Sequence, residues 1–76
     1  MKFEISRNQE TLFTVRAATY DLAAGMAARK LYGRKATSTR TSGTVGMSGY
    51  FRAHVPVQGK HSGMTSVGED FHVRAI

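Results

Sequence analysis

Hydrophobic and polar residues alternate with the period of a β-strand in two segments near the start of the chain. These segments are residues 2–7 and 12–17, and the polar residues 8–10 between them are short enough for a turn. Alternation of this kind is typical of a strand with one buried face, and so short a connection indicates an antiparallel hairpin. The apolar positions expected on the inner face are Phe3, Ile5, Phe13 and Val15.

Residues 19–32 show the features of a helix. Thr19 is a favourable N-cap, Asp21 lies where the helix dipole favours an anion, and Gly33 follows as a C′ residue. Apolar residues at spacings of three and four define one face, which consists of Leu22, Ala23, Met26, Ala27 and Leu31. We expect this face to lie close on a sheet because it is rich in alanine, and Gly25 to mark a still closer backbone approach.

Three further strands are expected after the helix. Residues 34–42 are rich in threonine, 50–57 alternate most clearly, and 70–76 alternate again at the end. The glycine-spaced residues 42–49 are interpreted as a link and the polar residues 58–69 as a long loop. The inward positions of the last two strands are Phe51, Ala53, Val55, Val57, Phe71, Val73 and Ala75.

The predicted fold is therefore a single α+β domain over residues 1–76, with the order β-β-α-β-β-β. Strands on both sides of one helix, with polar outer faces, favour an antiparallel sheet with the helix packed on one face. A chain of 76 residues without cysteine depends on a modest core or on a partner subunit, which leaves a homodimer open. The residues expected in the core are Phe3, Ile5, Phe13, Val15, Leu22, Met26, Leu31, Phe51, Val55, Phe71 and Val73.

The chain is basic, with a net charge of +6 from 11 Lys and Arg residues against 5 acids. The acids lie near the two ends of the sequence, and none occurs between Leu22 and Gly68. A long stretch of cations without carboxylates points to a polyanionic partner. A soluble surface that is simply basic explains the same distribution equally well.

Two groups of residues are candidates for contacting a polyanion. The first consists of Arg29, Lys30, Arg34, Lys35 and Arg40, and cations at a helix end also complement the dipole without any ligand. The second, on the outer sheet face, consists of Tyr50, Arg52, His54, His72 and Arg74. Parity adds Lys2, Thr14 and Arg16 to that face, with Glu4 as the one strong dissenting acid. Such a face can contact phosphates and stack on bases, although a solvated sheet face has the same composition.

Neither metal binding nor catalysis is expected. His54 and His72 share the outer face, but zinc needs three or four ligands, and arginines on the same face would repel it. The five carboxylates show no paired spacing, and no serine or cysteine is set up as a nucleophile. Residues 42–49 have neither the spacing nor the strand-to-helix setting of a phosphate-binding loop, so no cofactor is implied.

The leading hypothesis is a small basic accessory protein that binds DNA or RNA through phosphates, without strong sequence specificity. The alternative is a protein-interaction module, acting through a strand edge or the 58–69 loop, where Met64 and Val67 have no obvious core position. No apolar run approaches the ~18 residues of a membrane span. Glu4 interrupts the first apolar segment, so we expect no signal peptide, and the absence of cysteine then favours a cytoplasmic location, with periplasmic or phage-borne settings left open.

Overall fold

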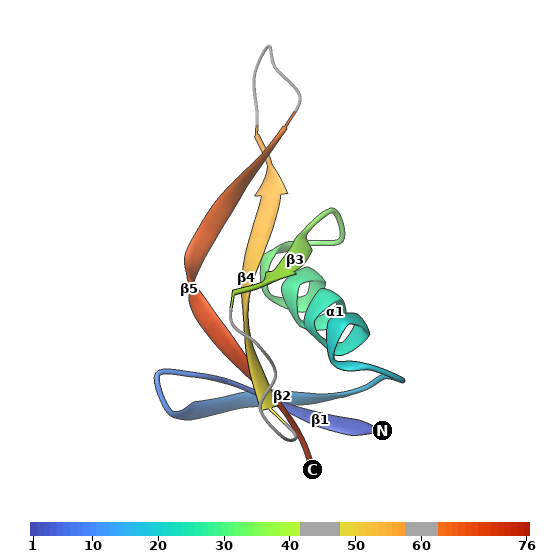
Figure 1. The fold of residues 1–76 in the computed structure, drawn as a ribbon. Helices are drawn as coiled ribbons and strands as arrows, with labels where there is room; N and C mark the ends of the chain where they lie inside the picture. The colour runs from blue at the N-terminus through green and yellow to red at the C-terminus, as the bar shows by residue number, and fades with distance from the viewer. Residues whose placement is uncertain (42–47, 58–62) are drawn as a thin grey trace.

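The computed structural model contains one helix and a five-stranded antiparallel sheet (Figure 1). The elements are β1 (Lys2–Arg7), β2 (Glu10–Arg16), α1 (Tyr20–Tyr32), β3 (Thr37–Arg40), β4 (Ser48–Pro56) and β5 (Met64–Ala75). The structure describes residues 1–41, 48–57 and 63–76, with only the backbone of 68 and 69. The strand order across the sheet is β2-β1-β5-β4-β3, and α1 packs on one face, mainly against β3 and β4. The predicted α+β class and element order are confirmed.

Two hairpins give the molecule its elongated shape of 42 × 21 × 20 Å. The β4–β5 hairpin extends well beyond the helix, whereas the β1–β2 hairpin runs in a different direction at its base (Figure 1). β1 pairs with only the last part of β5, from Ser6 opposite His72 to Phe3 opposite Ala75. The two hairpins therefore diverge beyond Ser6, and this divergence positions the candidate site described below.

The predicted ends of the helix are confirmed. The Thr19 side chain accepts a hydrogen bond from the Leu22 backbone N–H at 3.2 Å, which satisfies one of the free donors of the first turn. At the other end, the Gly33 N–H donates to the Arg29 carbonyl at 2.9 Å. Gly33 has a φ of 107°, a conformation that favours glycine, so the chain can leave the helix here.

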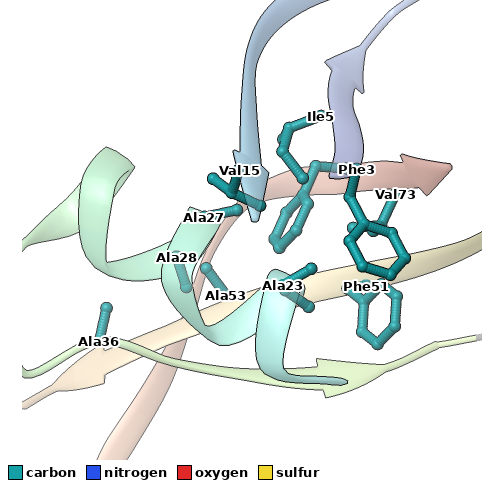
Figure 2. Close-up of a cluster of buried hydrophobic side chains, with 12 residues drawn as sticks. Phe3, Ile5, Val15, Ala23, Ala27, Ala28, Ala36, Phe51, Ala53 and Val73 are labelled. Carbon is teal, nitrogen blue, oxygen red and sulfur yellow. The ribbon is translucent and has the colours of Figure 1, made fainter. Parts of the chain in front are cut away.

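The core joins large side chains of the sheet to small ones of the helix. The largest fully buried side chains all come from the sheet: Phe3, Ile5, Phe51, Phe71 and Val73. The fully buried residues of the helix are all alanines, namely Ala23, Ala24, Ala27 and Ala28, and Figure 2 shows Ala23, Ala27 and Ala28 directed towards side chains of the sheet. Small residues are required on the helix because the sheet's phenylalanines already fill the space between the layers.

The prediction that the large apolar residues of the helix are buried is wrong. Leu22 is 56% exposed and Met26 is 37% exposed, and Leu31 is only half-buried. The helix is turned so that its alanines, rather than its larger residues, face the sheet. Phe13 and Val55, also expected in the core, are half-buried at its margin.

The predicted close approach at Gly25 is also wrong. A Cβ placed there would lie 3.3 Å from Arg29 Nη1, and no atom of the sheet would lie within 4 Å. The nearest neighbour is therefore the flexible end of a side chain on the same helix.

The predicted 58–69 loop is wrong from Met64 onwards. β5 begins at Met64, which lies opposite Pro56, while 58–62 are outside the described residues. A register shift of β5 opposite Phe51–Ala53 breaks the alternation, so the period of the strand is not visible in its sequence. The predicted 42–49 link is likewise shorter, because Ser48 and Gly49 belong to β4 and 42–47 are outside the described residues.

Candidate nucleic-acid interface

Four exposed cations lie together at the C-terminal end of α1 and in the turn that follows it. This helix-end cluster consists of Arg29, Lys30, Arg34 and Lys35. Among the described residues, no carboxylate lies within ion-pair distance of any of the four. Lys30 is held locally, since its Nζ lies 4.8 Å from the centre of the Phe13 ring. Arg34 and Lys35, in the turn before β3, are therefore the cations most available to a ligand.

Arg40, the fifth member of the predicted patch, lies at the opposite end of the helix. β3 returns along α1, and Arg40 Nη2 lies 3.2 Å from Asp21 Oδ1 in the first helical turn. Its guanidinium also lies 5.7 Å from the centre of the Phe51 ring. The two helix ends are separated by about 17 Å of helix axis, so the structure does not bring Arg40 together with the helix-end cluster.

Two arginines of the outer sheet face, Arg52 and Arg74, are paired with acids, whereas Arg16 is exposed and has no ion pair among the described residues. Arg52 Nε donates to Asp70 Oδ1 at 2.8 Å. Arg74 Nη2 donates to Glu4 Oε1 at 3.1 Å. These pairs neutralise the face locally, although each exposed pair contributes only about 0.2–1 kcal/mol to stability.

Asp70 lies on the same face as His72, as its spacing in the sequence indicates, but its pairing with Arg52 was not predicted. Its two carboxylate oxygens accept hydrogen bonds from Arg52 and from Thr41 Oγ1, the latter at 3.1 Å. The outer face therefore carries two acids, Glu4 and Asp70, and its net positive charge is lower than predicted.

The two described histidines share the outer face but lie at different positions along it. His72 is opposite Tyr50, with the ring centres 4.8 Å apart and the planes inclined at 50°. His54 is opposite Ser66, whose Oγ lies 3.5 Å from His54 Nδ1. His61 lies outside the described residues. Within the described part of the chain, no three side chains of His, Cys, Asp or Glu gather as a metal site.

An open hollow of about 330 Å³ lies beside the Tyr50–His72 pair. Its lining comes from β1, the β1–β2 turn, β4 and β5, and consists of Ser6, Arg7, Asn8, Gln9, Tyr50, Asp70 and His72. It lies where the β1–β2 hairpin diverges from β5, beyond the last paired residues Ser6 and His72. The sequence placed Tyr50 and His72 on this face and a turn at residues 8–10, but not the turn beside the two rings, because the divergence of two hairpins is a tertiary feature.

The family comparison adds no functional assignment. A scan against models of known protein families finds no match for this chain, and a search of the curated proteins likewise finds none. Within the described residues, no helix is long and apolar enough to cross a membrane. Function must therefore be inferred from the charge and geometry of the described residues.

Proposed function

We propose that this protein binds nucleic acid, mainly through phosphate contacts and without strong sequence specificity. The helix-end cluster carries this proposal. It presents four exposed cations with no carboxylate partner among the described residues, whereas Arg40, Arg52 and Arg74 are paired. Free cations on one surface release condensed counterions when they contact phosphates, and this release drives non-specific binding.

The chemistry of the helix-end cluster favours phosphates over base edges. Specific base recognition requires side chains held in a defined orientation against a groove. Arg34 and Lys35 lie in an exposed turn and have no hydrogen-bond partner among the described residues that would orient them. Phosphate contacts of this kind position a protein on a nucleic acid without selecting its sequence.

A direct binding measurement tests this function. Generic duplex DNA, single-stranded DNA and RNA are titrated with the protein at low salt, and binding is followed by fluorescence anisotropy. We expect all three to bind, and unrelated sequences of equal length to bind with similar affinity. Absence of binding at low salt and tens of micromolar protein would contradict the proposal.

A free strand edge favours one second candidate, a protein-interaction module. β1 covers β5 only from His72 onwards, so the edge from Met64 to Phe71 is unpaired among the described residues. No charged residue occurs from Met64 to Gly68, and Met64 is 46% exposed. Uncharged free edges can accept a strand from another chain. A saturable protein complex that persists at high salt, and that Met64→Lys weakens, would support this candidate instead.

A further inference from the structure

The hollow beside Tyr50 combines an aromatic wall with a polar rim. Its volume of about 330 Å³ lies at the lower end of the range for small-molecule sites, which suits a ligand of nucleotide size. Tyr50 remains 51% exposed although it lines the hollow. The site therefore offers an open ring rather than a buried one.

The aromatic wall is held in place by a cross-strand pair. Tyr50 and His72 are direct partners in the β4–β5 ladder, and their ring centres lie 4.8 Å apart. His72 thus supports the Tyr50 ring from the neighbouring strand, which limits the side-chain freedom that a ligand would otherwise have to remove. An exposed, supported ring is the platform on which single-stranded nucleic-acid binders stack bases.

The polar rim comes from the two-residue turn between β1 and β2. Asn8 and Gln9 have φ values of 53° and 66°, so both adopt the left-handed conformation that a tight two-residue hairpin requires. The turn thereby brings two amide-bearing residues to the edge of the hollow, which Ser6 also lines. Amide groups both donate and accept hydrogen bonds, as the edges of nucleobases do.

The charges around the hollow permit a phosphate nearby. Both oxygens of Asp70 already accept hydrogen bonds, from Arg52 and Thr41, so its negative charge is compensated. Arg7 lines the hollow and donates from Nη1 to Tyr32 Oη at 3.1 Å. Tyr32 is the last residue of α1 and directly precedes the turn that carries Arg34. Arg7 thus links the rim of the hollow to the C-terminal end of α1.

We propose that the hollow holds one unpaired nucleobase, stacked on Tyr50 and contacted by Asn8 and Gln9. This inference rests on the proposed nucleic-acid function and adds the ligand class, a single strand. Bases of a duplex are stacked inside the helix and cannot enter the hollow, whereas the bases of a single strand are free to do so.

The test compares two single strands that differ only in their bases. An oligothymidylate and an abasic oligonucleotide of equal length carry the same phosphates, and each is titrated with the protein at one low salt concentration. We expect the oligothymidylate to bind about tenfold more tightly, the order of effect of one stacked base. Tyr50→Ala should reduce its affinity to that of the abasic strand, and Tyr50→Phe should preserve the difference.

The matched control is Ser66→Ala, which alters the outer sheet face opposite His54, away from the residues that line the hollow, and should leave the tenfold difference intact. Circular dichroism of each variant shows that the fold is retained. Equal binding of the two strands by the unmodified protein, or a preference that survives Tyr50→Ala, overturns the hollow as a base site but leaves phosphate binding intact. Binding of neither strand overturns the proposed function, and the base site with it.

Discussion

The helix end and the outer sheet face both carry arginines, but they differ in whether those arginines form ion pairs. At the helix end, Arg34 and Lys35 are exposed and have no carboxylate within ion-pair distance among the described residues. On the outer face, Arg52 and Arg74 lie 2.8 and 3.1 Å from acids. Two regions of similar composition therefore differ in the charge that they can offer to a polyanion.

This difference in ion pairing arises because β1 and β5, which carry acids, pair with each other and β5 pairs with β4. Glu4 and Arg74 are 70 residues apart in sequence but are direct partners in the β1–β5 ladder. β5 likewise places Asp70 beside Arg52 of β4. A stretch of sequence without acids is thus not a region of space without acids. Among the described residues, the cations of the turn after α1 have no ion pair with a carboxylate of these strands.

The largest effect is expected at the helix end. Arg34→Ala combined with Lys35→Ala removes two phosphate contacts, each of which contributes a slope of about 0.9 to the dependence of log affinity on log salt. Duplex affinity should therefore fall roughly 50-fold at about 0.1 M salt, alike for all sequences. Anisotropy titrations of two unrelated duplexes measure this loss, and a loss confined to one of them would indicate base recognition instead.

A smaller effect is expected when an acid of the outer face is neutralised. Asp70→Asn leaves Arg52 without a charged partner, so Arg52 can contact a phosphate, and affinity should rise about three- to eightfold at low salt. Glu10→Gln is the matched control, because it changes the net charge equally at an exposed position that has no ion pair among the described residues. If both variants tighten binding by the same factor, net charge rather than pairing determines the affinity.

The smallest effect on binding is expected from Arg40→Ala. Arg40 contacts Asp21 and the Phe51 ring, far from the helix-end cluster, so affinity should change less than about twofold. The loss should appear in stability instead, at about 0.5–1 kcal/mol, because an exposed ion pair and a cation–π contact are removed together. Urea unfolding measures this cost, with Arg34→Ala as the control that should leave the midpoint unchanged.

Local signals predicted much of this fold. The alternation of residues 2–7 and 50–57 gave the correct inner and outer faces, and Thr19 and Gly33 marked the helix ends. Such features depend on nearest neighbours along the chain, so they can be read without tertiary structure. The same holds for the cations at the helix end, whose exposure follows from the C-terminal turn itself.

Features that depend on packing could not be predicted. Leu22 and Met26 have the spacing of core residues, but beside Phe3, Phe51 and Phe71 the fully buried positions of the helix are all alanines. The start of β5 was hidden by a register shift opposite β4. The hollow could not be predicted because it arises where two hairpins diverge, which is a tertiary feature.

The most direct test of the account is the salt dependence of two variants with equal charge. Arg34→Ala/Lys35→Ala and Arg52→Ala/Arg74→Ala each remove two positive charges, and the slope of log affinity against log salt is measured for both on one duplex. The first should lower the slope by about 1.8 relative to the unmodified protein, and the second by less than about half of that, because its arginines are already paired. Equal reductions for the two variants would contradict the claim that pairing, rather than net charge, locates the binding surface.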